Sequence, residues 1–272
     1  MTRTEAYAKL NLALVVGPLR ADGKHEVETV MQAVELHDDV ELEPAKALFV
    51  DGFAEDTLVR RALETLAEAA GVAPRWRVRI AKRIPAAAGL GGGSSDAAAA
   101  LRLANTTLPA PLPPDVLHEV AAGVGSDVPF FLRDGPQLAT GDGAELVPAM
   151  LPSDYAVLVA LPHGSRKEST ASVYQSFDER GGARGFGERR AALRRALAEV
   201  ERARDLAALP ANDLASSSVS VDLRLAGAFR ADVTGAGPAV YGLFERLEDA
   251  RHAAAELRDV GRIWLTRPVA GR

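Results

Sequence analysis

The segment Pro85-Ala86-Ala87-Ala88-Gly89-Leu90-Gly91-Gly92-Gly93-Ser94-Ser95-Asp96 has four glycines within five positions. Glycine has no side chain, so the backbone of such a segment can adopt positive φ angles and approach a ligand closely. The alanine-rich sequence that follows predicts a helix from Ser94 or Ser95 to about Asn105. The first N–H groups and the positive dipole end of that helix would form an anion site suited to phosphates.

Other phosphate motifs match this segment less well. It has no Gly-Lys-Ser/Thr ending, so it is not a Walker A loop. A dinucleotide fingerprint needs a third glycine where Ser94 stands. The alternative is a mobile glycine loop before an ordinary capped helix. As a phosphate site, the segment would bind a nucleotide through Pro85, Gly89, Gly91, Gly92, Gly93, Ser94 and Ser95, the two serines contacting phosphate or a magnesium-bound water.

The sequence before the glycine segment predicts two long strands, a helix and a further strand. Residues 5–16 and 27–43 are strand-rich, and Asp22-Gly23 between them is a turn signal. Apolar residues recur on one helical face over residues 57–70. Residues 76–80 alternate between apolar and charged residues, as a half-buried strand does.

After the glycine segment, helices and strands mix without strict βαβ alternation, so the fold class is α+β. We expect turns over 135–143, a strand over 155–161, a long charged helix over 188–209, a loop over 232–237, a strand over 239–244, a helix over 247–258 and a strand over 263–266. A boundary near residue 150 divides the chain into domains 1–150 and 151–272.

Composition limits the possible functions. The 272 residues are 47% hydrophobic and 25% charged, with a formal net charge of −5 and no cysteine. Thiolate catalysis and Cys-ligated metal sites are excluded, and the scattered basic residues do not favour nucleic-acid binding. No apolar run approaches the roughly 20 residues of a membrane span, and no export signal follows Met1. We therefore expect a cytoplasmic protein, bound neither to nucleic acid nor to a membrane.

The glycine segment resembles the phosphate loop of the GHMP kinases, the family of galactokinase, homoserine kinase, mevalonate kinase and their relatives. Four more segments occur in the family's order and extend the resemblance over nearly the whole chain. They are Ala8-Lys9-Leu10-Asn11-Leu12, Gly125-Ser126-Asp127-Val128-Pro129-Phe130-Phe131, Asn212-Asp213-Leu214 and Thr234-Gly235-Ala236-Gly237-Pro238. The Asp-Val-Pro-Phe-Phe run is the most discriminating of these motifs.

The resemblance implies a fold of two α+β parts with the active site in the cleft between them. It also implies ATP-dependent phosphorylation of an alcohol, with Mg²⁺ arriving with ATP. The members that these segments resemble most act on a cytidine diphosphate-linked polyol. We expect a monomer or a weak homodimer. No dedicated metal site is expected from the protein itself, because the five histidines lack metal-ligand spacing.

Two residues are the catalytic candidates. By the resemblance, Asp127 is the base that accepts the proton of the substrate hydroxyl. Lys9 lies in an apolar stretch and would need a negative partner, for which Asp127 is the candidate. Taken alone, Asp127 would more often be a turn or N-cap residue, and Lys9 could equally be an edge-strand lysine facing solvent. Asn11 shares the strand face of Lys9, where it could bind the substrate or Asp127.

The remaining site residues would bind the substrate. The resemblance places His25 on a cytosine ring, Tyr174 as an aromatic wall beside it, Thr170 as a polar contact, and Gly235 in a loop that approaches the substrate or the phosphate loop. Outside the family context, each could be structural. Lys24 departs from the family, which has a tyrosine here that stacks on cytosine. A lysine could instead make a cation–π or phosphate contact.

Two alternative functions stay open at this point. One is a GHMP kinase that acts on a different small alcohol, and Lys24 is the observation that suggests it. The other is a non-catalytic nucleotide-binding relative, although Lys9, Asp127 and the four loop glycines are all present. A dinucleotide-dependent oxidoreductase is disfavoured because the fingerprint fails at Ser94.

Overall fold

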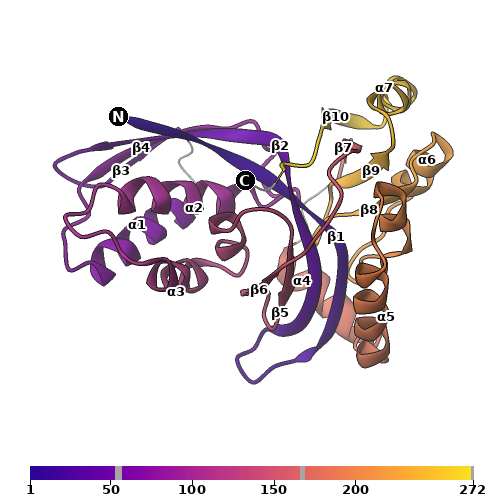
Figure 1. Cartoon of the computed structure of the whole chain (residues 1–272), viewed down its shortest axis with the longest axis horizontal. Coiled ribbons are helices and arrows are strands. Elements are labelled where there is room, and N and C mark those ends of the chain that lie inside the picture. Colours follow the sequence, from indigo (N-terminus) through magenta and orange to yellow (C-terminus); the bar gives the residue numbers. More distant parts are fainter. Residues whose placement is uncertain (53–56, 166–168, 271–272) are drawn as a thin grey trace. The chain divides into compact units, whose positions relative to one another are not determined.

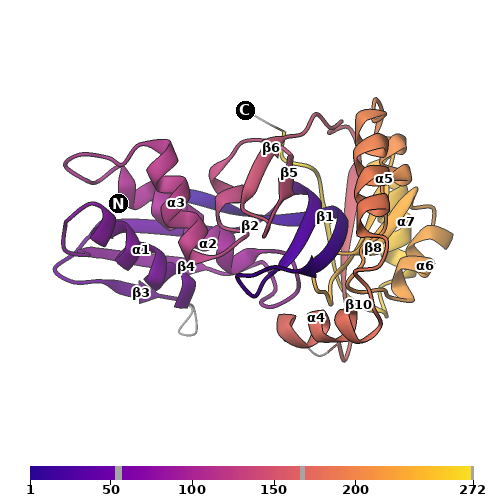
Figure 2. The same ribbon diagram turned by 90° about the horizontal axis from the view of Figure 1, so that it is seen from below.

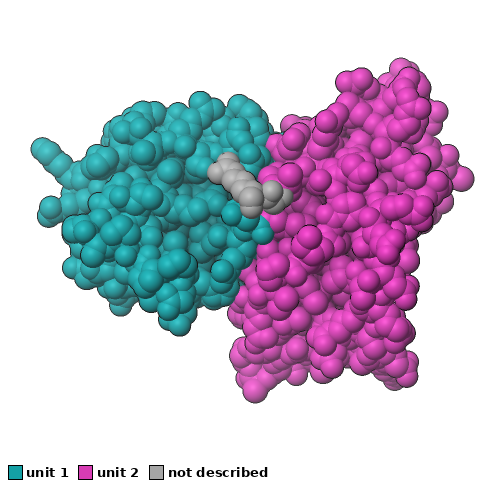
Figure 3. Space-filling model, viewed as in Figure 1, with its two compact units in different colours: residues 1–8, 36–86, 91–134 teal, residues 9–35, 87–90, 135–272 magenta. Residues whose placement is uncertain are grey.

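The computed structural model describes residues 1–52, 57–165 and 169–270, which form two compact units (Figure 3). Unit 1 contains Met1–Ala8, Leu36–Ala86 and Gly91–Asp134. Unit 2 contains Lys9–Glu35, Ala87–Leu90 and Gly135–Arg272. The chain passes between the units several times, and the glycine segment itself is divided between them. A division into family domains at about residue 150 stays a prediction.

Unit 1 is a small sheet covered by helices. Its sheet combines β3 (Phe49–Asp51), β4 (Trp76–Ala81) and the C-terminal half of β2 (His25–Pro44), with β3 parallel and β2 antiparallel to β4. The helices are α1 (Thr57–Ala69), α2 (Gly92–Asn105) and α3 (Pro114–Val124), followed by the 3₁₀ helix η1 (Pro129–Leu132). Figures 1 and 2 show α1, α2 and α3 on one face of this sheet.

Apolar periodicity accounts for these elements. Val59, Ala62, Leu63 and Leu66 on one face of α1 are fully buried. In β4, the buried side chains alternate with more exposed ones, as expected for a strand covered on one face. The helix expected over 57–70 and the strand expected over 76–80 are confirmed.

Unit 2 contains most of β1 (Thr2–Leu19), the N-terminal half of β2, and the hairpin of β5 (Gln137–Thr140) and β6 (Glu145–Pro148). A separate antiparallel sheet has the order β10-β7-β9-β8. Its strands are β7 (Ala156–Pro162), β8 (Arg230–Val233), β9 (Val240–Phe244) and β10 (Gly261–Thr266). The remaining helices are α4 (Thr170–Glu179), α5 (Phe186–Ala198), η2 (Ala203–Ala208), α6 (Val219–Leu225) and α7 (Leu247–Glu256).

Helices α6 and α7 cover one face of this four-stranded sheet (Figures 1 and 2). One apolar cluster joins them to it, including Leu158 of β7, Leu223 of α6, Phe244 of β9 and Ala250 of α7. A second cluster packs α4 against β1 and β2 through Val16, Val27, Val173 and Phe177. This second cluster fixes α4 beside the strand that carries His25.

The helix expected over 188–209 is wrong in its extent. The chain forms α5 over Phe186–Ala198 and the 3₁₀ helix η2 over Ala203–Ala208, with a break between them. The carboxylate of Asp205 accepts hydrogen bonds from the N–H groups of Glu201 and Arg202 and so starts a new turn. Charged residues at helical spacing conceal this break in the sequence.

Other boundaries also differ from the expectation. The segment 135–143, expected as turns, contains β5, whose residues Gln137 and Ala139 are buried. The loop expected over 232–237 begins later, because β8 includes Asp232 and Val233. Helix α2 begins at Gly92, two residues before the expected start, with Gly91 as its N-cap in the left-handed conformation.

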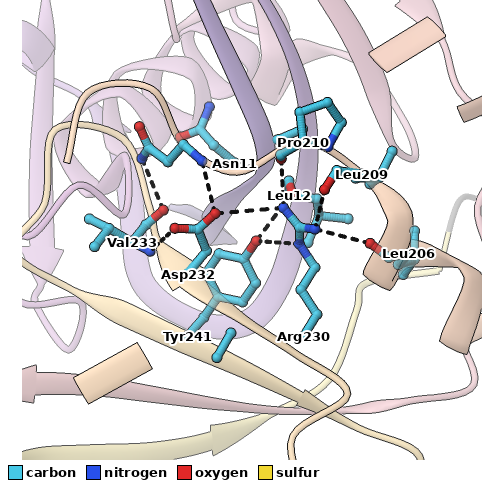
Figure 4. A network of polar contacts seen from close by, with 12 residues as sticks. Asn11, Leu12, Leu206, Leu209, Pro210, Arg230, Asp232, Val233 and Tyr241 are labelled. Atoms are coloured by element: carbon cyan, nitrogen blue, oxygen red, sulfur yellow. Dashed lines mark hydrogen bonds and ion pairs between the residues drawn. The ribbon is translucent and has the colours of Figure 1, made fainter. Parts of the chain in front are cut away.

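A buried arginine holds several segments of unit 2 together (Figure 4). Arg230 donates hydrogen bonds to the Tyr241 hydroxyl at 3.1 Å and to the carbonyl groups of Leu206, Leu209 and Pro210 at 3.2, 2.6 and 2.8 Å. Its guanidinium also lies 3.6 Å from the carboxylate of Asp232. An arginine has five donors and no acceptor, so this set of oxygens satisfies most of its hydrogen-bonding capacity.

Replacement of Arg230 by methionine should destabilise the protein, because several buried oxygens lose their donor and Asp232 loses its counter-charge. We expect a loss of about 3–5 kcal/mol in the free energy of unfolding. Urea denaturation followed by circular dichroism measures it. The control is Arg204→Met, which breaks an exposed ion pair with Glu245 and should cost less than about 1 kcal/mol. Equal effects of the two substitutions would contradict a stabilising role of the buried network.

Candidate active site

Strand β1 brings Lys9 and Asn11 together in the interior of unit 2. Both residues point to one strand face, and the Lys9 Nζ donates a hydrogen bond to Asn11 Oδ1 at 2.6 Å. They are 3% and 4% exposed. Burial of an ammonium group costs free energy unless polar groups contact it. Asn11 Oδ1 provides such a contact for Lys9. The shared face expected from the sequence is confirmed.

Asn11 is held from three directions. Its N–H donates to the Thr234 hydroxyl oxygen at 3.0 Å, and its side-chain amide donates to Thr29 Oγ1 at 2.8 Å. The Thr29 hydroxyl in turn donates to the carbonyl group of Ala13 at 2.6 Å. With Lys9 bonded to Oδ1, the orientation of the Asn11 amide is fixed.

The first part of the glycine segment packs against the C-terminal glycine loop. Gly89 has φ +83°, and a Cβ atom at this residue would lie 2.2 Å from the carbonyl oxygen of Thr234. The Thr234 hydroxyl donates to the Gly89 carbonyl group at 3.3 Å. At Gly235, with φ +58°, a Cβ atom would lie 3.2 Å from the Gly89 carbonyl oxygen and 3.5 Å from Asn11 Oδ1. The approach of Gly235 to the phosphate loop, one of two possibilities from the sequence, is therefore present.

The glycine segment is also bonded to β1. The N–H of Lys9 donates to the carbonyl group of Leu90 at 2.9 Å. On the other side, the N–H of Ala239 donates to the carbonyl group of Ala88 at 3.0 Å. The segment Ala87–Leu90 therefore lies between β1 and the C-terminal loop, with backbone bonds to each.

The motif Asn212-Asp213-Leu214 has a structural role in this arrangement. The Asn212 amide donates to the carbonyl groups of Val233 and Gly235 at 3.0 and 2.7 Å. The Asp213 carboxylate accepts from the N–H of Val16 at 2.8 Å and from Arg189 at 3.0 Å. The motif joins the glycine loop to β1, in agreement with the expectation that it fixes the loops.

In unit 1, the second part of the glycine segment begins helix α2. Gly91, with φ +70°, precedes the helix and provides no side-chain cap, so the first N–H groups of α2 have no acceptor within the helix. A Cβ atom at Gly92 would lie 3.0 Å from the Ile84 side chain, and one at Gly93 would lie 3.3 Å from Leu58. Open N–H groups beside small residues suit a phosphate group.

The other predicted nucleotide-binding residues adjoin this helix start. Pro85 is partly exposed and directly follows the buried residue Ile84. Ser94 is partly exposed in the first turn of α2, whereas Ser95 is only 2% exposed. Ser94 is therefore the serine better placed to reach a ligand, and Ser95 belongs to the interior of unit 1.

A buried ion-pair network lies next to the start of α2. The Lys82 Nζ lies 2.6 Å from the carboxylates of Asp38 and Asp96, both of which are fully buried. Burial acts to lower the pKa of Lys82, but the two carboxylates outweigh it and raise the pKa above its usual value. A Cβ atom at Gly92 would lie 3.4 Å from Lys82 Nζ, so this network packs directly against the glycine segment.

Asp127 lies in the turn between α3 and η1 and is partly exposed. The turn is closed by a hydrogen bond from the Val128 N–H to the Gly125 carbonyl group at 3.0 Å. Buried Phe130 and Phe131 anchor the following η1. Asp127 belongs to unit 1 and Lys9 to unit 2, so the ion pair between them stays a prediction.

The predicted base-binding residues form a cluster in unit 2. His25, at the start of β2, stacks on Tyr174 of α4 with ring centroids 4.7 Å apart and an angle of 29° between the rings. Thr170 lies one helical turn before Tyr174, so the two share a helix face. No local sequence pattern predicts the hydrogen bond that joins His25 Nε2 to Asp178 Oδ1 at 2.9 Å.

Lys24 does not contribute to this aromatic cluster. Its ammonium group forms an ion pair with Asp142, in the turn between β5 and β6. Partial burial acts to raise the pKa of Asp142, but hydrogen bonds from Lys24 and from the Ala144 N–H hold it below the usual value. Lys24 is half exposed, and its partner is a carboxylate of the protein.

A cavity of about 510 Å³ opens in unit 2 beside α4. Its walls come from Val173 and Ser176 and from the segments 162–165, 214–217 and 236–238. Its lining is mixed, with serine hydroxyls and apolar side chains, as in many sites for small polar molecules. The cavity is therefore bordered by the C-terminal glycine loop and by the helix that carries Thr170 and Tyr174.

Two further properties concern metals and membranes. Within residues 1–52, 57–165 and 169–270, no group of three or more His, Asp or Glu side chains is arranged to hold a metal ion. Among the helices of these same ranges, none has both the length and the apolar character needed to cross a bilayer.

Sequence reasoning missed three residues of these clusters. Thr234, fully buried, links Asn11 to Gly89. Lys82 and Asp178 complete the ion-pair network and the histidine contact described above. Thr234 opens a recognised motif, which is a usable signal, whereas the partners of Lys82 and Asp178 are remote in sequence and no local pattern predicts them.

The chain matches family models of the GHMP kinases N terminal domain over residues 57–135 and of GHMP kinases C terminal over residues 222–263. It is 42% identical to the 4-diphosphocytidyl-2-C-methyl-D-erythritol kinase of Pelotomaculum thermopropionicum, an alignment that covers 93% of this chain and 92% of the relative. It is 34% identical to the kinase of the same name from Chlorobium phaeobacteroides, over 97% and 96% of the two chains.

Solved structures agree with these sequence matches. A crystal structure of 4-(cytidine 5'-diphospho)-2C-methyl-D-erythritol kinase aligns with a TM-score of 0.79 and 33% identity, covering 99% of this chain and all of the other. A mevalonate kinase aligns at a TM-score of 0.78 but only 15% identity, so it supports the fold alone. This chain belongs to the GHMP kinases and, within them, to the family of 4-diphosphocytidyl-2-C-methyl-D-erythritol kinases.

Proposed function

We propose that the protein transfers the γ-phosphoryl group of ATP to the 2-hydroxyl of 4-diphosphocytidyl-2-C-methyl-D-erythritol, a step in non-mevalonate isoprenoid precursor biosynthesis. The relatives at 34–42% identity carry the name of this activity. The observation that carries the proposal is the cluster in unit 2, in which buried Lys9 and Asn11 are bonded to both glycine loops. Such a cluster places a fixed cation and an amide beside the segment that would hold phosphates.

The start of α2 would hold the phosphates of ATP. The N–H groups of its first turn and the Ser94 hydroxyl are the donors, while the missing side chains at Gly92 and Gly93 let the start of the helix pack closely on Ile84 and Leu58. ATP would supply the phosphoryl group, and the magnesium ion bound to ATP would neutralise part of the charge on its phosphates. The protein itself would bind the phosphate groups and hold them in a single orientation.

Asp127 would accept the proton of the attacking hydroxyl, and Lys9 would hold that carboxylate in its ionised form and orient it. Asn11 is pre-oriented by Thr29 and Thr234 and would fix the alcohol by a hydrogen bond. Most of the rate in phosphoryl transfer comes from positioning and electrostatics. The rigid contacts of Lys9 and Asn11 suit that requirement.

The cytidine end of the substrate would bind at the cluster of β2 and α4. His25 would contact the base, Tyr174 would provide an aromatic surface, and Thr170 would add a polar contact. Gly235 would allow the C-terminal loop to approach the phosphorylated part of the substrate. The adjoining cavity of about 510 Å³ supports a small-molecule site in this region.

A second candidate is a GHMP kinase that acts on a different small alcohol. The observation that favours it is Lys24, which stands where a stacking tyrosine is expected and pairs with Asp142. This change would affect recognition of the base more than the phosphoryl transfer. We also propose that the protein is a monomer or a weak homodimer and that it is cytoplasmic. Its family domains would span residues 1–150 and 151–272.

Purified protein with magnesium and ATP should phosphorylate 4-diphosphocytidyl-2-C-methyl-D-erythritol, because the proposed phosphate-binding and catalytic residues are all present. Product formation measured by ³¹P NMR, with ADP release as a second readout, is the test. ATP binding without turnover of this substrate, but with turnover of another alcohol, would replace the first candidate by the second.

Asp127→Asn should lower kcat by about 100-fold or more, because an amide cannot accept the hydroxyl proton. ATP binding, measured by calorimetry, should be unchanged. The matched control is Asp115→Asn in the first turn of α3, which should keep kcat near the wild-type value. Wild-type turnover by the Asp127 variant would show that another group is the base.

Gly89→Ala should lower kcat/KM by about 100-fold, because the added Cβ would overlap the Thr234 carbonyl oxygen and displace the loop by a fraction of an ångström or more. Gly123→Ala on α3, where a Cβ atom meets nothing within 4 Å, is the control and should be neutral. Thermal melting verifies that both variants fold. An unchanged kcat/KM for Gly89→Ala would mean that the close approach of the two loops is not needed for turnover.

A further inference from the structure

Helix α4 presents a stripe of polar and aromatic residues toward the start of β2. Thr170, Tyr174 and Asp178 follow one another at intervals of four residues, which places them along one side of the helix. His25 touches two members of this stripe, since it stacks on Tyr174 and is hydrogen-bonded to Asp178. Phe177 meets the His25 ring edge-on, with centroids 6.0 Å apart.

These contacts leave little of the His25 ring for a ligand. One ring face is covered by Tyr174, and only 7% of the side chain is exposed. A ligand that touches His25 therefore meets an edge of the ring, where the nitrogen atoms lie. Of the two nitrogens, Nε2 is bonded to Asp178 at 2.9 Å, so Nδ1 is the one available for recognition.

Asp178 also decides the chemical character of that second nitrogen. A carboxylate can only accept hydrogen bonds, so the contact requires the proton of His25 to be on Nε2. In the neutral ring, Nδ1 then carries a lone pair and accepts hydrogen bonds. Cytosine has one donor on its base-pairing edge, its amino group, and uracil has a carbonyl oxygen in that position.

The other side of the base site is unusual in this chain. Lys24 provides no aromatic wall, and its ammonium group is bound to Asp142. Tyr174 already covers one face of the His25 ring, so a base can contact His25 only at the edge of that ring. This arrangement places more of the base selectivity on the hydrogen bond of His25 than an aromatic pair would.

We propose that Asp178 is a positioning residue for nucleobase recognition: it fixes the His25 proton on Nε2 and the ring against Tyr174, so that Nδ1 accepts a hydrogen bond from the amino group of a cytosine. This inference rests on the proposed function, because it assigns the cytidine end of the substrate to His25. Asp178 itself does not take part in phosphoryl transfer.

Histidine ring nitrogens can be observed directly by two-bond ¹H–¹⁵N NMR at about pH 8, where an ordinary histidine is neutral. The His25 signals are assigned by their loss in His25→Gln. The wild-type protein should show Nε2 protonated and Nδ1 unprotonated, and Asp178→Ala should show a mixture of both tautomers. A wild-type ring protonated on Nδ1, or an identical pattern in the variant, would overturn the proposal.

Kinetics and binding give a second readout. Asp178→Ala should raise KM for the cytidine substrate about tenfold, the size of one lost hydrogen bond between neutral groups, with kcat and the KM for ATP nearly unchanged. The wild type should bind CDP more tightly than UDP, and the variant should lose most of this preference. The matched control is Glu179→Ala, which removes the neighbouring exposed carboxylate of α4 and should change neither value.

The outcomes separate this inference from the proposed function. Wild-type turnover of the cytidine substrate together with an unchanged KM and CDP preference in Asp178→Ala would overturn the role of Asp178 and leave the kinase activity standing. Absence of CDP binding by the wild type would overturn the base site itself. A parallel fall of kcat and of ATP binding in Asp178→Ala would indicate a general structural role and would also contradict the proposal.

Discussion

The backbone of Gly89 lies so close to that of Thr234 that no side chain fits between them. This close approach depends on two glycine loops that are remote in sequence, and it fixes where each can lie in unit 2. Thr234 Oγ1 accepts a hydrogen bond from the Asn11 N–H, and Asn11 Oδ1 accepts one from Lys9. The position of Thr234 therefore also determines the positions of Asn11 and Lys9. Lys9, Asn11 and the segment Ala87–Leu90 are therefore held in fixed positions relative to one another. Under the proposed function, such fixed positions suit phosphoryl transfer, which depends mainly on positioning.

Buried ion pairs hold segments of each unit in place. Arg230 binds the backbone that leads into Asn212, while Asp232 accepts from the Asn212 N–H at 2.9 Å. In unit 1, Lys82 is held between Asp38 and Asp96 beside the start of α2. Breaking a buried pair leaves an uncompensated charge, so such groups have few alternative positions.

The sequence alone predicted the helices and strands whose residue pattern is local. Strict alternation predicted β4, one-sided apolar spacing predicted α1, and the strand period of two predicted that Lys9 and Asn11 share a face. Glycine content and alanine content together located the start of α2 to within two residues, and its role as a phosphate site stays a prediction. Elements whose limits depend on a specific capping contact, such as the break before η2 made by Asp205, could not be placed.

Contacts between remote segments were the other part that the sequence did not contain. The motif around His25 predicted that this residue binds the substrate. Its partner Asp178 lies in another element and belongs to no motif. The same holds for Lys82, whose carboxylate partners come from β2 and α2. Single-chain patterns describe which residue types are present at a site. Which of them touch depends on the packing of whole elements, such as α4 on β1 and β2.

The ion pair of Lys24 with Asp142 has a consequence for how this family can diversify. It lies at the surface, where such pairs add at most about 1 kcal/mol to stability. Exchange of residue 24 therefore costs the fold about 1 kcal/mol at most, while the residue is the sequence neighbour of His25. Positions of this kind are free to vary by drift, and selection can then act on the altered substrate range without first having to repair the fold.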